Sequence, residues 1–554
     1  MSTPKQCERD EAWGNAMYRV FKRGFGLTVV VVTTGALAAI PAGSALSGGS
    51  ASSGPPAEQP PAISSQPSDR QQTARPIERG DRLASPLLPA GYVLVDTVVS
   101  NTNPNLKSTD RQPDGEPSLA LNGANPNEIV ISSFNSRWLN GNAAIYRSTN
   151  GGSIWTKAYS IPPPTGVART GCPCDQVVDF DRSNRLLGTF LNFASNRGDV
   201  YTGSTANAGN PASWLWRTVN GVAQKTDNPG VDDADQPWLR VTRDAFKSTQ
   251  DDAFVAYDDF TSPFDLRVSV SRGANPPNMT TTRIIGYPGP CNCVNPGTRL
   301  GPDHRNGTMY VLYQYDTARN PNGSVHIRYA LNRSTNSGST WSLNGSSVGI
   351  TVAEANSSQP TPKFGTVNAL LGGVDAVGVD NTSGNVYVVY GYRDPSTGKN
   401  RLAIARLASN GSGGLTVVYR RFVTGQVQAA LPSVAVASNG TVGVLYDTFD
   451  GFNASGSPVF SAHLAQSIDH GSTFSDVKLL AFASSAKNNG DSRQRVLGDY
   501  QSLRARGSTF YGSFTANGAQ FGRPVSDMDA IFFKAPARAA ASGAAATVGT
   551  LPTG

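Results

Sequence analysis

The chain has 554 residues, of which only 16% are charged and 38% are hydrophobic, and 58 are glycine. This composition is typical of a turn-rich all-β protein and disfavours a helical cytosolic enzyme. The formal net charge of +7 is modest, and no dense run of Lys and Arg follows the N-terminal segment. These features exclude a nucleic-acid-binding function.

The first 45 residues have the pattern of a secretory signal peptide. A basic region (residues 19–23) precedes a short apolar core (residues 27–40), and small residues at 43–45 offer a cleavage site. The apolar run is too short to span a bilayer comfortably, so an uncleaved anchor or a buried strand is the alternative. Met17 is an alternative start. We therefore predict a secreted protein, extracellular or at the cell envelope, with no integral membrane span after cleavage.

Residues 46–90 are rich in Ser, Pro, Gly, Gln and Ala and contain few aromatics. Such a segment cannot bury enough apolar surface to order itself, so it is predicted to be a disordered linker. The Ala- and Gly-rich residues 537–554 are predicted to form a disordered tail. Residues 91–536 between them form one β-rich domain in this interpretation.

Within that domain, pairs of short strands recur at intervals of roughly sixty residues. Alternating apolar residues and β-branched or aromatic content favour strands, and no segment has a helical period with caps. The first strands are expected at 116–121, 175–178, 235–241, 295–300, 374–379, 431–436 and 499–503. The second strands are expected at 129–134, 186–193, 253–260, 309–315, 386–392, 442–446 and 510–514.

Seven such units predict an all-β fold, a seven-bladed β-propeller, because radial repetition leaves only short and protected strand edges. The last unit is one strand short, and residues 92–99 are expected to supply that strand and close the ring. Six blades are the alternative, because the fourth unit (residues 291–344) is poorly defined.

A turn motif recurs three times, as Ser-Thr-Asn-Gly-Gly-Ser-Ile-Trp at 148–155 and in close copies at 334–341 and 467–474. Ser and Asx side chains bond backbone amides in such turns, Gly takes a positive φ, and the final aromatic anchors the turn. The motif resembles the Asp box, or bacterial neuraminidase repeat, of the sialidase superfamily, which lies between the third and fourth strands of a blade. The resemblance covers residues 114–534. It implies the fold more than the activity, because Asp boxes also occur in other glycoside hydrolases, sorting receptors and binding propellers.

Propeller geometry brings the starts of the first strands and the ends of the second strands to one face, and the Asp boxes to the opposite face. Many carboxylates should converge on the first face, where repulsion raises some pKa values or a cation binds. No cofactor or metal is assigned, although oxygen-rich turns near Asp175 could hold Ca²⁺.

The sialidase resemblance implies three arginines that clamp a substrate carboxylate, a Tyr nucleophile with a Glu beside it, and an Asp acid/base. Glu116 and Tyr500 are the candidate dyad, since the first and last units are neighbours in a closed ring. Alternatively, Glu116 occupies a slot that Gln236 and Leu431 fill in other units, with no chemical requirement.

Asp235 and Asp258 are the acid/base candidates, with a structural role at the surface or between blades as the alternative. The substrate-binding candidates are Arg137, Arg393, Arg240 and Asp114. The Arg-Ile-Pro signature of the family is missing, glutamate is scarce, and the catalytic sialidases resembled here have six blades. Two functions therefore stay open. One is an exo-α-sialidase-like glycoside hydrolase, and the other is a non-catalytic propeller that binds a glycan, glycoconjugate or protein. We expect a monomer in both cases.

Four cysteines remain outside the leader, in the motifs Cys172-Pro173-Cys174 and Cys291-Asn292-Cys293. In a secreted chain they suggest two disulfides, formed within or between the motifs. A four-thiolate zinc site is the alternative, but Cys-x-Cys is tighter than the usual ligand spacing.

Overall fold

The computed structural model describes residues 88–97, 115–134, 144–167, 173–194, 197–226, 233–259, 265–286, 294–319, 325–357, 375–393, 399–426, 428–484, 497–521 and 528–539. All of these lie in one compact unit, Thr73–Gly554. The signal peptide, nearly all of the linker and most of the tail lie outside the described residues, so those assignments stay predictions.

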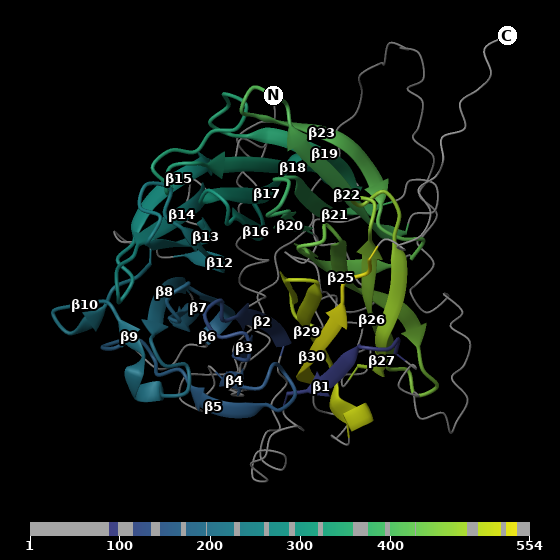
Figure 1. Cartoon of the computed structure of the whole chain (residues 1–554), viewed down its shortest axis with the longest axis horizontal. Helices are drawn as coiled ribbons and strands as arrows, with labels where there is room; N and C mark the ends of the chain where they lie inside the picture. The colour runs from purple at the N-terminus through teal and green to yellow at the C-terminus, as the bar shows by residue number, and fades with distance from the viewer. Residues whose placement is uncertain are drawn as a thin grey trace, which may run out of the picture. The chain divides into compact units, whose positions relative to one another are not determined.

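The described residues form seven four-stranded antiparallel sheets in a ring, a seven-bladed β-propeller (Figure 1). The all-β fold is confirmed, and the blade count is seven. The first three blades contain β2 (Gly115–Leu121), β3 (Ile129–Phe134), β4 (Ala144–Ser148) and β5 (Thr156–Ser160), then β6 (Pro173–Phe180), β7 (Leu186–Ala194), β8 (Arg197–Thr205) and β9 (Leu215–Trp216), then β12 (Ala234–Arg243), β13 (Asp251–Asp259), β14 (Asp265–Arg272) and β15 (Thr280–Gly286). The next three contain β16 (Val294–Asp303), β17 (Thr308–Arg319), β18 (Val325–Ser334) and β19 (Ile350–Ser357), then β20 (Asp375–Val379), β21 (Val386–Arg393), β22 (Asn400–Ser409) and β23 (Leu415–Phe422), then β24 (Ala429–Val436), β25 (Val442–Phe452), β26 (Pro458–Ser467) and β27 (Ser475–Ala483).

The seventh blade closes the ring with strands from both ends of the domain. Its order is β1-β30-β29-β28, with β1 at Val93–Asp96, β28 at Ser502–Arg506, β29 at Thr509–Asn517 and β30 at Met528–Pro536. Antiparallel pairing places Val93 opposite Lys534 and Asp96 opposite Ile531. The expected closing strand is therefore confirmed, and it joins the first and last segments of the propeller through backbone hydrogen bonds.

Outside the blades, the described residues contain a two-stranded hairpin, β10 (Thr218–Val219) and β11 (Val222–Ala223), and two short 3-10 turns, Pro211–Ser213 and Gly518–Phe521. No α-helix occurs in the described segments. Likewise, no described helix is long and apolar enough to cross a membrane.

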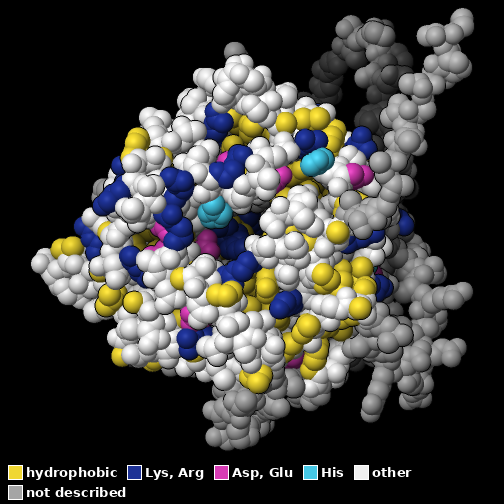
Figure 2. Space-filling model, viewed as in Figure 1, with side chains coloured by type: hydrophobic (Ala, Val, Ile, Leu, Met, Phe, Trp, Pro, Cys, Tyr) yellow, Lys and Arg dark blue, Asp and Glu magenta, His cyan; other side chains and the backbone are white. Residues whose placement is uncertain are grey.

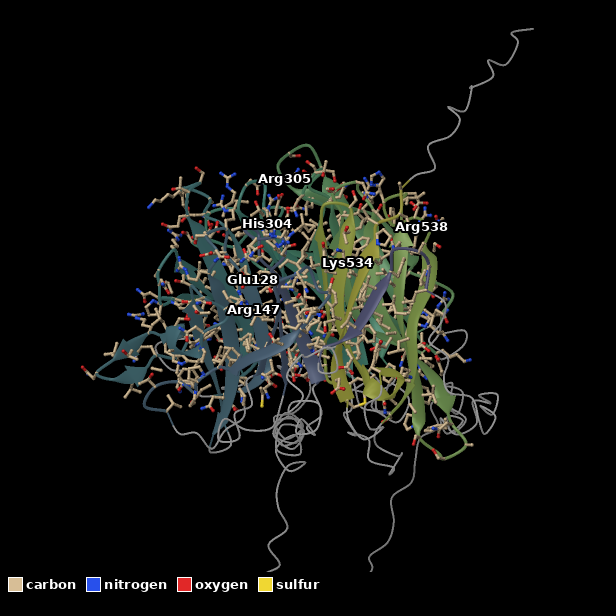
Figure 3. The ribbon with its side chains drawn as sticks, turned by 60° about the horizontal axis from the view of Figure 1, so that its bottom comes forward. Glu128, Arg147, His304, Arg305, Lys534 and Arg538 are labelled. Carbon is tan, nitrogen blue, oxygen red and sulfur yellow. The ribbon has the colours of Figure 1, made fainter. Side chains whose placement is uncertain are left out.

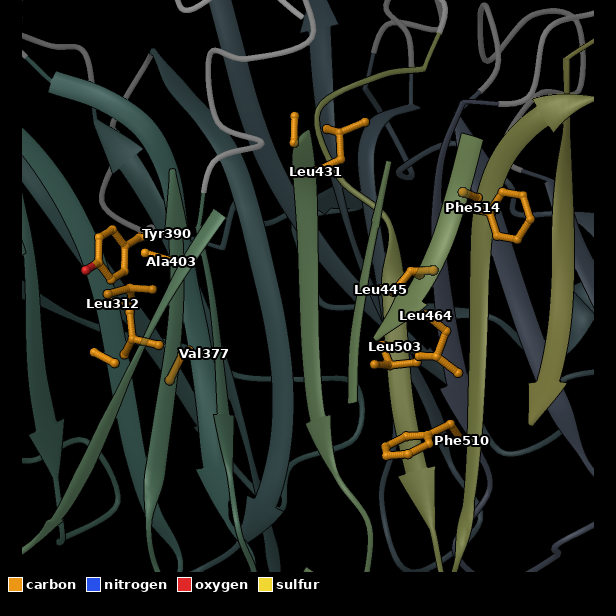
Figure 4. Close-up of a cluster of buried hydrophobic side chains, with 14 of the residues drawn as sticks. Leu312, Val377, Tyr390, Ala403, Leu431, Leu445, Leu464, Leu503, Phe510 and Phe514 are labelled. Atoms are coloured by element: carbon orange, nitrogen blue, oxygen red, sulfur yellow. The ribbon is translucent and has the colours of Figure 1, made fainter. Parts of the chain in front are cut away.

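The apolar core lies between the blades, where the face of one sheet packs on the next. Leu445 and Leu464 of the sixth blade meet Leu503, Phe510 and Phe514 of the seventh, and all five side chains are buried (Figure 4). Each such side chain contributes roughly 1.5–3 kcal/mol of burial free energy. The alternating strand residues thus hold the ring together blade by blade.

The three repeated turns begin at the last residue of a third strand, as the motif predicts. In the first copy, Ser148 Oγ accepts the Gly152 amide at 2.9 Å, and Asn150 Oδ1 accepts the amide four residues later. Trp155 donates to the Gly152 carbonyl at 3.0 Å, and its ring lies 5.0 Å from Phe532 of the preceding blade. Gly152 has φ +91°, and an added Cβ would lie 2.3 Å from Phe532. We call these turns (148–155, 334–341 and 467–474) the box turns.

The other two box turns repeat this geometry. Ser334 Oγ accepts the Gly338 amide at 2.9 Å, and Ser467 Oγ accepts the Gly471 amide at 2.7 Å. In the third copy, hydrogen bonds from Ser467, Thr473 and Ser472 outweigh the effect of partial burial and lower the pKa of Asp469 to about 2. The same side-chain pattern therefore builds the same turn in three blades.

Candidate functional site

The candidate site lies where the first strands begin, at one end of the channel enclosed by β2, β6, β12, β16, β20, β24 and β28. We call this end the mouth face, and the end that carries the box turns the box face. Figure 3 turns the box face upward, and the labelled His304 and Arg305, in the turn after β16, lie near that end.

A repeated backbone feature marks the start of the inner strands. Glu116, Asp175, Gln236 and Leu431 all have positive φ, between +46° and +55°, and each lies at a register shift against the second strand. A non-glycine residue in this conformation costs roughly 1–2 kcal/mol. Because four blades share the bulge, Glu116 occupies a backbone position that recurs around the ring, and its role stays a prediction. Sequence reasoning aligned these positions but did not predict the bulge.

Two carboxyl groups share a hydrogen bond next to this bulge. Burial, followed by the charge and hydrogen bond of Asp175, raises the pKa of Asp235 well above its ordinary value. The Gln236 amide donates to Asp235 Oδ1 at 2.9 Å, which orients the carboxyl. This raised pKa favours the protonated form of Asp235, on an inner strand at the mouth face.

Asp258 lies directly opposite Asp235 in the β12–β13 register and adds a further negative charge that raises the Asp235 pKa. Its two oxygens accept the Gly297 amide and the Thr298 hydroxyl of the next blade, both at 3.3 Å. The structure thus brings both predicted acid/base candidates together, with Asp175 as a third carboxyl.

Other carboxyl groups near the mouth face also have raised pKa values. Burial raises the pKa of Asp375 to about 8, and neither carboxyl oxygen has a hydrogen-bond partner among the described residues. Burial, then the nearby Asp450, raises the pKa of Asp447 well above its usual range. The expected upward shifts are present, but burial rather than repulsion is the larger cause. No group of three or more His, Cys, Asp and Glu in the described segments has the arrangement of a metal site.

Glu116 and Tyr500 are neighbours across the closure of the ring. Glu116 Oε1 accepts the Asp499 amide at 3.0 Å. Burial, followed by the charge of Glu116, raises the pKa of Tyr500 well above its ordinary value. The Tyr500 hydroxyl donates to the Gln176 carbonyl at 3.2 Å, and its ring meets Trp238 edge-on at 5.2 Å. Tyr500 therefore extends from the seventh blade to the second and third, and its hydroxyl is protonated. The dyad role stays a prediction.

The predicted arginines do not form one cluster among the described residues. Arg240 lies two residues beyond Trp238 on β12, deeper in the channel, with its guanidinium 4.9 Å from the Trp238 ring. Arg299 of the next blade lies 4.2 Å from the same ring. Arg393 lies at the end of β21, where burial lowers its pKa. Arg137 and Asp114 lie outside the described residues.

Sequence reasoning missed Arg299, Arg504 and Trp238. Regular pairing of the inner strand begins at Trp238 in the third blade and at Ser502 in the seventh, and Arg240 and Arg504 each follow two residues later. Aligning the inner strands by the start of regular pairing would therefore have grouped these two arginines. Of the four predicted disulfide cysteines, Cys174 is described and is disulfide-bonded. Cys172, Cys291 and Cys293 lie outside the described residues, so the pairing stays a prediction.

Comparisons with known proteins identify structural likenesses of low similarity. No protein-family model matches the sequence, and no curated protein matches it. Among solved structures, an ulvan lyase from a family of polysaccharide lyases is 10% identical, with a TM-score of 0.40, covering 76% of this chain and 93% of that one. A puromycin hydrolase is 14% identical, with a TM-score of 0.37, covering 73% and 50%. A Hadza microbial sialidase is 11% identical, with a TM-score of 0.28, covering 62% and 74%. At these similarities they determine neither the reaction nor the substrate of this chain.

Proposed function

We propose that the protein is a secreted, glycan-acting β-propeller, a glycoside hydrolase in which Asp235 is the proton donor. The observation that carries this proposal is the buried, hydrogen-bonded pair of Asp175 and Asp235 at the mouth end of the inner strands. A general acid must hold its proton at the working pH, and an ordinary Asp with a pKa near 3.9 does not. Burial beside a second carboxyl supplies that condition at Asp235.

Glycoside hydrolysis ordinarily requires a second carboxyl group as base or nucleophile. Asp258 is the candidate, because it is the cross-strand partner of Asp235 and its oxygens are oriented by Gly297 and Thr298. Asp175 would then act through Asp235, as the group that keeps its proton in place. This assignment uses two carboxyl groups and no tyrosine nucleophile.

An exo-α-sialidase-type reaction on terminal acidic sugars is the more specific form of the proposal. It requires an ionisable Tyr and an arginine clamp at the mouth face. Tyr500 is protonated and bonded to Gln176, and Arg240 lies deeper in the channel. These features favour a two-carboxyl mechanism over the sialidase form.

A non-catalytic glycan-binding propeller is the second candidate. The seven blades favour it, since the catalytic sialidases that the box turns resemble have six. In that case the same carboxyl groups would accept hydrogen bonds from sugar hydroxyls and cleave no bond.

The test uses the full chain with a panel of fluorogenic neutral, uronic and sialic glycosides, together with a glycan array. Asp235→Asn should lower kcat by about 10²–10⁴-fold, the usual contribution of general acid catalysis. Asp447→Asn is the control, because Asp447 is a buried carboxyl with a raised pKa in another blade, at the position of the sixth blade that corresponds to Asp258. The kcat of the wild type should fall as pH rises through the raised pKa of Asp235.

Each outcome separates the candidates. Cleavage of neutral or uronic glycosides supports the two-carboxyl hydrolase, and cleavage of the sialoside alone supports the sialidase form. Selective retention on the array without any cleavage supports the binding propeller. Full activity of Asp235→Asn would refute Asp235 as the proton donor.

A further inference from the structure

The box-face end of the channel differs in charge from the mouth face. Figure 2 looks onto the box face and shows a central hollow, with Lys and Arg side chains gathered within and around it. The inner strands carry Arg240 and Arg504 at equivalent positions, and burial lowers the pKa of both guanidinium groups. The charge of Arg504 also acts on Arg240, and the two residues stand at equivalent register positions on two inner strands of the same ring.

These two guanidinium groups have almost no hydrogen-bond or ion-pair partners among the described residues. Each offers five N–H donors. Arg240 is 8% exposed, and its one hydrogen bond within the described segments runs from Nη1 to the Leu239 carbonyl at 2.8 Å. Arg504 forms no hydrogen bond or ion pair with a described residue, and its buried Nη2 has no acceptor there. Buried guanidinium groups are normally paired, because desolvating an unpaired charge is costly.

The surrounding residues do not balance this charge. Asp179 is the nearest opposing group, but its oxygens accept the Phe180 amide at 3.1 Å and the Val241 amide at 3.0 Å. It therefore attracts the arginines from a distance without bonding to them. Arg299 adds a third positive charge that acts on Arg240. Arg240 and Arg504 thus lie near Asp179 without forming an ion pair with it, and neither forms an ion pair with another described residue.

A neutral hydrogen-bonding group completes the hollow. His304 Nδ1 lies 3.3 Å from the Thr242 hydroxyl, and burial lowers the pKa of the imidazole. A neutral imidazole adds no charge, but one of its nitrogens can donate a hydrogen bond to an oxygen ligand.

We propose that this hollow binds a dianionic tetrahedral oxyanion, a sulfate or phosphate group, between Arg240 and Arg504. The positive charges of the two guanidinium groups match a dianion, and the planar arrangement of their N–H donors matches the oxygens of such a group. The group is either a free ion or an ester on a larger molecule, since the chemistry recognised is the same.

This site is separate from the proposed catalytic site. Arg240 is five residues beyond Asp235 along β12, on the order of 15 Å at the usual rise of a strand. Trp238 lies between them on the same strand, and Tyr500 packs against its ring. The two proposals can therefore fail independently.

The test measures binding of sodium sulfate and sodium phosphate to the full chain by calorimetry and thermal unfolding, with chloride holding ionic strength constant. Either oxyanion should raise Tm, since a ligand that binds only the folded state stabilises it. Arg504→Met and Arg240→Met should each raise the Kd at least tenfold. Arg421→Met is the matched control and should leave the Kd unchanged, because Arg421 is exposed on β23 with one long hydrogen bond to Ser472.

A second readout distinguishes a binding residue from a structural one. Without sulfate or phosphate, Arg504→Met should melt at or above the wild-type temperature, because it removes a partly buried cation that has no hydrogen-bond or ion-pair partner among the described residues. A structural Arg504 would instead lower Tm and leave the oxyanion response intact, which would overturn the proposal. If a Met variant fails to fold, Arg504→Lys is used instead. Lysine keeps the positive charge but lacks the planar pair of N–H donors, so this variant should still raise the Kd for sulfate and phosphate several-fold.

Three ligand comparisons complete the experiment. Tighter binding of a sulfated or phosphorylated saccharide than of the free ion assigns the site to an ester, and equal affinity assigns it to the ion. A wild-type Tm that responds no more to sulfate and phosphate than to chloride refutes the site. Stronger binding of glucuronate, a monocarboxylate, than of sulfate or phosphate would refute the assignment of the site to a dianion.

Discussion

Substituting Tyr500 by Phe tests whether its hydroxyl is a nucleophile or a structural donor. The side chain is 3% exposed, donates to the Gln176 carbonyl at 3.2 Å, and meets Trp238 at a centroid distance of 5.2 Å. Tyr500→Phe removes one oxygen and leaves the ring packing unchanged. The hydroxyl is protonated at neutral pH because burial and the nearby Glu116 raise its pKa.

The magnitudes follow from that geometry. Losing one buried hydrogen bond costs about 0.5–1.5 kcal/mol, and the unpaired Gln176 carbonyl brings the expected loss of stability to about 1–2 kcal/mol. We expect kcat on any glycoside that the protein cleaves to stay within about twofold of wild type. Removing a true nucleophile would lower kcat by about a thousandfold or more.

Urea unfolding measures the loss of stability, and hydrolysis of the glycoside identified in the panel measures kcat. Tyr329→Phe is the matched control, because its buried hydroxyl donates to the Gly391 carbonyl at 3.0 Å in another blade. Both variants should lose similar stability and keep activity. A thousandfold loss of kcat in Tyr500→Phe alone, with the fold intact, would refute this reasoning and restore the dyad.

Three further predictions concern stability. Gly152→Ala should lower the free energy of unfolding by about 2–4 kcal/mol in denaturant, because the added Cβ would lie 2.3 Å from Phe532 at a φ of +91°. A loss of less than about 1 kcal/mol would contradict this prediction. Asp469 has a pKa lowered to about 2, so its stabilising contribution is present above the unfolded pKa near 4 and is lost as pH falls toward 2. Asp469→Asn should remove that part of the loss of stability at acid pH. Identical profiles of stability against pH for this variant and the wild type would contradict the prediction. Asp375 has a pKa raised to about 8, so its ionisation in the unfolded state lowers the stability of the wild type as pH rises from about 4 to 8. The stability of Asp375→Asn should therefore increase relative to wild type between pH 5 and pH 8. A stability difference between the two proteins that does not widen with pH would contradict this prediction.

The sequence by itself determined the architecture, because the signals for the blades are local. Alternating apolar residues specify each strand within a few positions, and the box turns fold through contacts four residues apart, such as Ser148 with Gly152. Even the closing strand was predictable, since the last unit lacked one strand and residues 92–99, which include β1, had a strand pattern. The count of seven blades follows from these repeats.

The tertiary structure alone decided which side chains meet, because those contacts cross between blades. Asp175 and Asp235 are sixty residues apart in the chain, and Arg240 approaches Arg504 only when the ring is closed. The bulge at the start of the inner strands moves later side chains relative to the simple alternation, and a non-glycine residue with positive φ leaves no clear pattern in one sequence. The raised pKa values of Asp235 and Tyr500 depend on burial that only the packed channel creates.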